Sequence, residues 1–146
     1  MKTHGALGNI SEVDREVADA VARAVRAVDP ALKYLAITLS EQFRAMERAG
    51  VEPIAEIYAD RGYTEKGGLI PRGQQGAMIE DPEAAADRVL EMVEAGAVIT
   101  ASGARLKAPI ESVCVHGDSP HAVESARRVR EKLEGAGIKV APFSKL

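Results

Sequence analysis

The stretch "SVCVHGDSPHAVESARRVREKL", residues 112–133, decides the fold class, because an apolar strand, a polar turn and a helix follow one another directly. The run "SVCV" is typical of a strand that is buried on both faces. The helix is expected over residues 120–134, with Asp118 or Ser119 as its N-cap. Strand–turn–helix units of this kind build parallel sheets. The turn also carries His116, one of three histidines in the chain.

Comparable segments recur along the chain and extend this interpretation. Further strands are predicted at residues 34–39, 53–60 and 138–143 and in the N-terminal segment "MKTHGAL". Helices are predicted from Ser11 to about Val28, from Ser40 to about Ala49 and over residues 82–96. This alternation predicts an α/β fold of parallel βα units, either an open sheet or an incomplete barrel. The length of 146 residues predicts a single α/β domain over residues 1–146.

Composition excludes several classes of partner. Apolar residues make up 46% of the chain and charged residues 28%, a balance typical of globular proteins. The net charge of −3 and the aromatic content of 3% argue against a nucleic-acid surface. A single cysteine excludes an internal disulfide, and no apolar run approaches the roughly 18 residues of a membrane span. We therefore expect a cytoplasmic protein that binds neither nucleic acid nor membrane.

Polar side chains gather after three of the predicted strands. They are Lys2, His4 and Asn9 after the first, Asp60, Arg61 and Tyr63 after "EIYA", and His116 and Asp118 after "SVCV". Parallel strands place such residues on one rim of the sheet. Imidazole and carboxylate groups there suit acid–base chemistry, and guanidinium suits a bound anion. The alternatives are a structural role for His116 and helix capping for Asp118.

The loop over residues 63–79 is long and rich in glycine, and long loops are often functional. Gly68 and Gly73 have the spacing of a P-loop, but Gln74 follows them where a Walker A motif has lysine. The glycines are more typical of a connection that needs positive φ angles, whereas Arg72 is a candidate anion ligand. Cys114 lies inside an apolar strand, and no Cys/His spacing predicts a metal site.

Four stretches, "KTHGALGN", "YADRGY", "GGLIPRGQQGAMI" and "VCVHGD", resemble in order and spacing those of the LamB/YcsF family, the A subunits of 5-oxoprolinase. Thr3 and Gly8 depart from the proline and tyrosine expected in the first stretch. The resemblance implies a partial or irregular (β/α) barrel of the glycoside hydrolase/deacetylase type. Family members carry further strands before the first stretch, so we expect this chain to be the C-terminal part of the family barrel.

Two functions follow as hypotheses. The resemblance implies a protein that opens 5-oxo-L-proline to L-glutamate, with ATP, together with partner subunits B and C; a metal requirement is left open. The candidate catalytic residues are then His4, Asp60, His116 and Asp118, and the candidate substrate-binding residues are Lys2, Asn9, Arg61 and Arg72. The alternative is a noncatalytic module that binds a partner subunit or a small anion. A free sheet edge in a shortened barrel further predicts a homo-oligomer or another covering chain.

Overall fold

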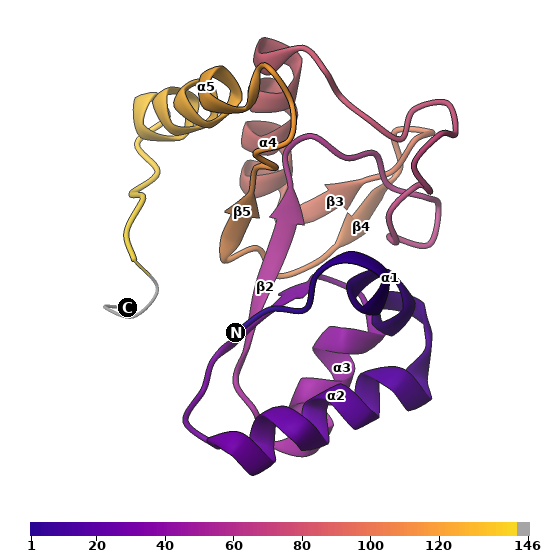
Figure 1. Ribbon diagram of the computed structural model, residues 1–146. Helices are drawn as coiled ribbons and strands as arrows, with labels where there is room; N and C mark the ends of the chain where they lie inside the picture. The colour runs from indigo at the N-terminus through magenta and orange to yellow at the C-terminus, as the bar shows by residue number, and fades with distance from the viewer. Residues whose placement is uncertain (143–146) are drawn as a thin grey trace. The chain divides into compact units, whose positions relative to one another are not determined.

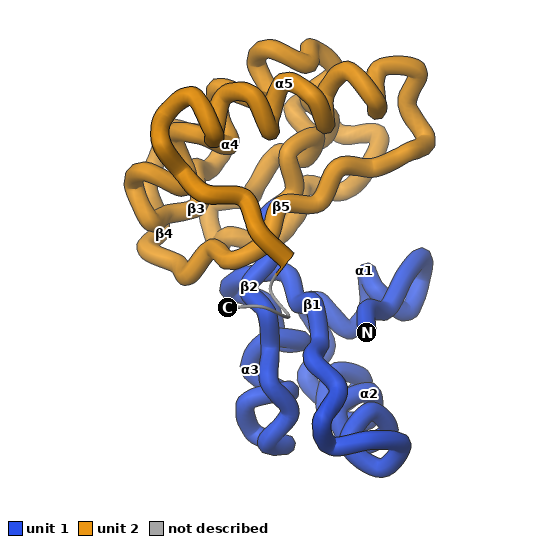
Figure 2. The backbone as a smooth tube through the Cα atoms, turned by 90° about the vertical axis from the view of Figure 1, so that its left-hand side faces the viewer, with its two compact units in different colours: residues 1–57 blue, residues 58–146 orange. Residues whose placement is uncertain are grey.

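The computed structural model describes residues 1–142 and divides the chain into two compact units, Met1–Ile57 and a second unit that begins at Tyr58 (Figure 2). Helices alternate with strands, and two strands of the first unit pair in parallel. The predicted α/β class is therefore confirmed. The single domain predicted over residues 1–146 stays a prediction.

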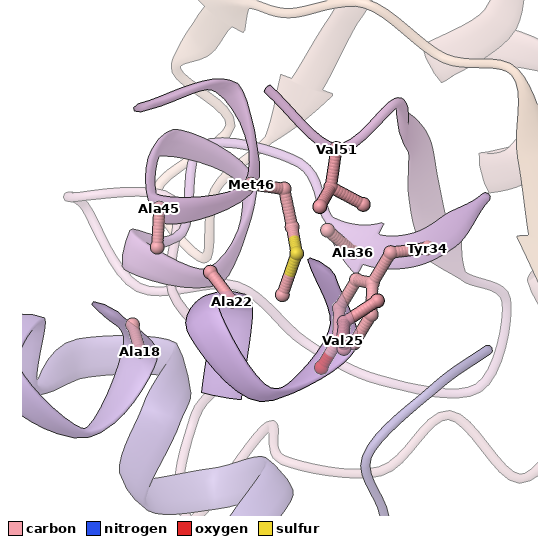
Figure 3. Packing of buried hydrophobic residues seen from close by; sticks show 8 residues of the cluster. All are labelled: Ala18, Ala22, Val25, Tyr34, Ala36, Ala45, Met46 and Val51. Atoms are coloured by element: carbon pink, nitrogen blue, oxygen red, sulfur yellow. The ribbon is translucent and has the colours of Figure 1, made fainter. Parts of the chain in front are cut away.

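The first unit packs helices against a parallel strand pair. Its elements are α1 (Gly5–Val13), α2 (Arg15–Val28), β1 (Tyr34–Ile37), α3 (Glu41–Ala49) and β2 (Pro53–Tyr58), within which the division falls (Figure 1). In the pair β1–β2, Tyr34 lies opposite Pro53 and Ile37 lies opposite Glu56. Met46 of α3 and Tyr34 are fully buried among small side chains of α2 and β1 (Figure 3). The alanines of α2 and α3 are small, so these two helices approach each other closely around Met46 and Tyr34.

The N-terminal segment differs from the sequence prediction. The strand predicted in "MKTHGAL" is wrong, because residues 1–4 are irregular and a helix follows them. Met1 bonds to the backbone at β1: its ammonium donates to the carbonyl of Lys33 at 2.6 Å, and its carbonyl accepts from Leu35 N–H at 2.9 Å. Gly5 then takes a φ of +58° and α1 begins. The helix predicted from Ser11 to about Val28 is confirmed as α2, but its predicted start is wrong, because Ser11 belongs to α1. Asp14 is extended, ends α1 and caps α2 by accepting from Val17 N–H at 3.0 Å.

The second unit contains α4 (Pro82–Ala95), β3 (Ala97–Ile99), β4 (Arg105–Lys107), β5 (Ser112–Cys114) and α5 (Ala122–Gly135), and α4 packs against α5 (Figure 1). Strands β3 and β4 form an antiparallel hairpin that the sequence did not predict, with Val98 opposite Leu106. Strand β5 lies beside Ala59, whose N–H donates to the carbonyl of Cys114 at 2.9 Å. That bond places the end of β5 next to the residues that follow β2.

The strand predicted at residues 138–143 is wrong for residues 138–142, which are irregular, and Phe143 lies outside the described residues. The reason is the end of α5. Gly137 takes a φ of +79°, and Ile138 N–H returns to the carbonyl of Leu133 at 2.9 Å, which closes the helix without extending the chain. Among residues 1–142, no helix has both the length and the apolar character needed to cross a membrane.

Candidate functional site

Asp60 and His116 meet in the second unit. Asp60 comes two residues after β2, His116 comes two residues after β5, and the bond between Ala59 and Cys114 holds the two segments together. His116 Nδ1 lies 2.8 Å from Asp60 Oδ1 and 2.9 Å from Oδ2. The side chain of Asp60 is 11% exposed and that of His116 is 26% exposed. The carboxylate is thus nearly enclosed, whereas the imidazole retains an accessible edge.

This contact defines the orientation of the imidazole. An ionised carboxylate only accepts hydrogen bonds, so the arrangement assigns the proton to Nδ1 and leaves the lone pair on Nε2. The Tyr58 ring packs against the imidazole edge to face, with ring centroids 5.1 Å apart and an angle of 83°. Tyr58 is itself fixed, because its backbone N–H donates to the buried Tyr63 hydroxyl at 2.7 Å. His116 is therefore positioned to accept a proton at Nε2.

A pocket of about 210 Å³ opens beside the pair. It is lined by Asp60, Met78, Ile79, Glu80, Val115, His116, Ser119, Pro120, His121, Ala122 and Ser125. Glu80 and His121 were not predicted; their sequence signal was their position, Glu80 directly after the glycine-rich loop and His121 at the start of the helix after "SVCVHGD". The lining combines an apolar wall with carboxylate and imidazole groups. Such a pocket suits a small, compact molecule with polar edges.

The glycine-rich loop folds back onto the residues after β2. Arg61 is buried, and its guanidinium donates to the carbonyls of Ile70 at 2.6 Å and Ala77 at 3.1 Å. Gly62 must be glycine, because a Cβ there would lie 1.9 Å from the carbonyl oxygen of Gly76. Ile79 N–H then donates to the Asp60 carbonyl at 3.0 Å. Arg61 thus holds the loop that forms one wall of the pocket, and it does not line the pocket itself.

Asp118 and Arg72 form an exposed ion pair, with 3.3 Å between Arg72 Nη1 and Asp118 Oδ2. Helix α5 begins at Ala122, two residues later than predicted, and neither Asp118 nor Ser119 is its N-cap. The N-cap is His121, whose N–H donates to Ser119 Oγ at 3.1 Å. Asp118 therefore does not cap α5, and its side chain pairs with Arg72 instead.

The predicted residues of the first unit have separate environments. Lys2 forms an ion pair with Glu56 of β2, whose side chain is 3% exposed; Glu56 was not predicted, although it is the one charged residue in the run "PIAEIYA". His4 is exposed at the start of α1 and makes no capping hydrogen bond, and Asn9 is exposed on α1. The shared rim predicted for these residues with Asp60 and His116 stays a prediction. No group of three or more His, Cys, Asp or Glu among the described residues is placed to hold a metal ion.

Comparison with known proteins identifies the family. The model of the LamB/YcsF family matches residues 1–146. The chain belongs to the LamB/YcsF family. The 5-oxoprolinase A subunit of Azorhizobium caulinodans is 62% identical over 144 residues, which are 99% of this chain and 57% of that protein. The 5-oxoprolinase A subunit of Gluconobacter oxydans is 49% identical over 96% of this chain and 55% of its own length.

A solved structure agrees with the fold. The crystal structure of the lactam utilization protein from Thermus thermophilus matches with a TM-score of 0.86 at 39% identity, covering 97% of this chain and 56% of that one. The α/β fold is thus consistent with a partial barrel. The LamB/YcsF chain described here spans a little over half the length of the relatives that it matches.

The two departures within the first LamB/YcsF stretch lie against each other. A Cβ at Gly8 would lie 3.2 Å from the Thr3 carbonyl oxygen, which is tighter than ordinary van der Waals contact. Thr3 N–H donates to the Tyr34 hydroxyl at 3.3 Å, and the Thr3 hydroxyl lies 2.6 Å from the same atom. Proline has neither group. Thr3 and Gly8 therefore form one local arrangement that a proline and a tyrosine at these positions would not reproduce.

Proposed function

We propose that this chain contributes the lactam-binding and proton-transfer part of an ATP-dependent 5-oxoprolinase, in which it serves as the A subunit alongside partner subunits B and C. The observation that carries the proposal is the Asp60–His116 pair, which opens into a pocket of about 210 Å³. The names of the relatives, which are a 5-oxoprolinase component and a lactam utilization protein, support the same chemistry.

Hydrolysis of a lactam needs a proton to be moved twice. Water forms a bond to the carbonyl carbon, the carbon–nitrogen bond of the ring breaks, and the nitrogen leaves as an amine after it receives a proton. His116 Nε2 accepts the proton of the attacking water and returns it to the ring nitrogen. Asp60 holds the imidazole and stabilises its protonated form. The apolar wall formed by Met78, Ile79 and Val115 packs against the methylene groups of the ring.

We assign ATP to the partner subunits. The pocket is lined by the carboxylates of Asp60 and Glu80 and by no lysine or arginine, which is unfavourable for a triphosphate. Its volume is also below the roughly 300–1,000 Å³ typical of sites for larger ligands. The glycine-rich loop lacks the lysine of a Walker A motif. These residues do not fit ATP, and the proton transfers above involve only the lactam and water.

The decisive experiment measures glutamate release from 5-oxo-L-proline by this chain with ATP and partner subunits B and C. We expect His116→Asn to lower the rate about 100-fold or more, because general acid–base catalysis contributes factors of about 10² to 10⁴. Asp60→Asn is expected to lower it as well, since the imidazole loses its orienting carboxylate. The matched control is Asp87→Asn, an aspartate on the surface of α4 that is paired with Lys132. It should retain the wild-type rate.

The alternative function has a distinct outcome in the same experiment. If the chain binds the partner subunits but releases no glutamate, while a full-length relative does, the noncatalytic module is supported instead. If His116→Asn retains the wild-type rate, the assignment of proton transfer to the Asp60–His116 pair is wrong even though the enzyme is active. Size-exclusion chromatography of the purified chain mixed with subunits B and C shows whether it binds them, and the glutamate assay then separates the two cases.

We further propose that the chain forms a homo-oligomer in the cytoplasm. The three residues of β5 are only half-buried, whereas strands of parallel sheets are normally covered on both faces. A second copy would cover this strand. Light scattering on the purified chain at low concentration tests the proposal, and a monomer with a single cooperative melting transition would contradict it.

A further inference from the structure

The ion pair between Arg72 and Asp118 is weakly held, and Asp118 directly precedes Ser119, which lines the pocket. One atom of the guanidinium, Nη1, contacts one carboxylate oxygen at 3.3 Å, and the two side chains are 51% and 59% exposed. Bidentate contacts between arginine and carboxylate are the strong ones, and exposed single contacts contribute little. The other nitrogens of the Arg72 guanidinium make no hydrogen bond within residues 1–142. This pair is therefore easily exchanged for a better carboxylate partner.

The position of Arg72 is nevertheless defined by the fold. The buried Arg61 binds the carbonyls of Ile70 and Ala77 on either side of it, which fixes the backbone of the loop. The other member of the ion pair, Asp118, lies in the turn between His116 and Ser119, and both of these residues line the pocket. The guanidinium is thus tied to the same turn that carries the catalytic imidazole.

The two carboxylates of the pocket favour a nearby cation when the ligand is an anion. The lining contains the carboxylates of Asp60 and Glu80, and no lysine or arginine is part of it. The lining carboxylates repel a ligand carboxylate, and a cation beside the pocket offsets this repulsion together with the imidazoles of His116 and His121. Arg72 is the cation that the structure ties to the turn after β5.

We propose that Asp118 occupies Arg72 in place of the ligand's own carboxylate, and that binding exchanges one carboxylate for the other at the guanidinium. The ligand is the carboxylate-bearing lactam of the proposed function, and Asp118 acts as an internal competitor that sets its affinity. This inference rests on the proposed function, because it assumes that the pocket takes the lactam ring. It changes the role of Asp118 from a catalytic group to a specificity-determining one.

Isothermal titration calorimetry on the 146-residue chain with two probes tests the exchange. The probes are 5-oxo-L-proline and 2-pyrrolidinone, which has the same ring without the carboxylate. We expect Asp118→Asn to bind 5-oxo-L-proline about two- to fivefold more tightly, as loss of a weak competing ion pair allows. Its affinity for 2-pyrrolidinone should not change. Arg72→Gln should lower the affinity for 5-oxo-L-proline about tenfold, as loss of a charge-assisted contact allows. Its affinity for 2-pyrrolidinone should not change.

The double variant and a surface control complete the test. In the Arg72→Gln background, Asp118→Asn should no longer improve binding, because the guanidinium for which it competes is gone. Asp87→Asn removes an exposed carboxylate elsewhere on the second unit and should leave both affinities unchanged. Equal melting temperatures of all variants show that the changes are confined to binding.

The possible failures are distinguishable. If the wild-type chain binds both lactams and Asp118→Asn changes neither affinity, the exchange at Arg72 is overturned and the lactam pocket stands. If Asp118→Asn raises the affinity for both probes equally, the effect is not a competition between carboxylates, and the inference is again overturned. If the wild-type chain binds neither lactam, the proposed function is overturned together with the inference that rests on it.

Discussion

The two compact units each contain an acid–base pair, and the pairs differ in their exposure. In the first unit, Lys2 and Glu56 form an ion pair in which the carboxylate side chain is 3% exposed and the lysine 18% exposed. In the second unit, Asp60 and His116 line a pocket, and the imidazole is 26% exposed. Glu56 belongs to β2 and Asp60 follows two residues after its end. Two buried carboxylates only four positions apart along the chain thus differ in their partner, which is an ammonium in one case and an imidazole that lines a pocket in the other.

The two pairs illustrate two roles of charged groups, one in stability and one in proton transfer. A charge that is removed from water needs its partner, and loss of that partner leaves a desolvated ion. A pair that retains contact with solvent contributes less to stability, but it can exchange protons with a ligand. Variants of the Lys2–Glu56 pair should therefore mainly lower stability, whereas variants of the Asp60–His116 pair should mainly lower activity.

The largest effect on the free energy of unfolding is expected from Lys2→Met. It removes the ammonium from the buried Glu56 carboxylate and should lower the free energy of unfolding by about 3–5 kcal/mol, the cost typical of breaking a buried ion pair. Urea denaturation followed by circular dichroism measures it. The double variant Lys2→Met, Glu56→Gln should recover part of the loss, because no buried carboxylate remains. A loss below about 1 kcal/mol in the single variant would show that this pair behaves as an exposed one.

Gly62→Ala is expected to have the next largest effect. The new Cβ would lie 1.9 Å from the Gly76 carbonyl oxygen, so the loop must shift, at a cost of about 1–3 kcal/mol. The shift should also disturb the backbone contact between Ile79 and Asp60 and so reduce lactam binding. Gly135→Ala, at a position with open space on α5, is the matched control and should leave stability unchanged or slightly higher. Equal stability of the two variants would contradict the close approach at Gly62.

Asp60→Asn should lower the free energy of unfolding by only about 1 kcal/mol, because asparagine keeps an acceptor oxygen for His116 Nδ1 and leaves no unpaired buried charge. The comparison of the two pairs depends on this value being clearly smaller than that for Lys2→Met. The same urea denaturation provides it. A loss as large as that of Lys2→Met would mean that the Asp60–His116 pair is primarily structural.

The smallest effect concerns Glu65, an exposed carboxylate outside both pairs. Hydrogen bonds from the Ser102 hydroxyl and backbone N–H, and then from Thr100, lower its pKa below the usual 4.5. Its stabilising contribution is therefore complete above pH 4.5 and is lost as the pH falls through the lower pKa of the folded state. The difference in melting temperature between wild type and Glu65→Gln should shrink over that range. Glu94→Gln, on an exposed position of α4, should show no such trend.

The sequence predicted the helices and strands that local patterns specify, and it failed where distant contacts decide. Residues 53–60 were predicted as a strand from their apolar character, and β2 lies there. The hairpin β3–β4 was missed because its second strand, Arg105–Lys107, is polar and exposed, so no apolar run marks it. The N-terminal segment "MKTHGAL" was counted as a strand whose beginning is missing, but residues 1–4 are irregular and α1 begins at Gly5.

The candidate site shows the same division. Asp60 and His116 could be proposed because each follows a recognisable strand, and the structure brings them together. Glu56 escaped notice because a single acid within an apolar run carries no motif, although burial makes its ion pair with Lys2 important. Arg61 is adjacent to Asp60 in sequence, yet its guanidinium points to loop carbonyls, which only the fold of residues 62–79 determines.

The way in which Arg61 and Gly62 hold the glycine-rich loop has a consequence for how this protein can evolve. Arg61 and Gly62 contact backbone carbonyls of the loop. The fold of the loop therefore depends little on the identity of its exposed side chains. Arg72, Gln74 and Gln75 are exposed and can therefore vary without loss of the core, whereas Gly73 and Gly76 take positive φ angles that favour glycine. Position 72 can exchange one charge for another while Asp60 and His116 keep their geometry. A library randomised at positions 72, 74 and 75 would thus present acidic, neutral or basic side chains while the geometry of the Asp60–His116 pair stays constant.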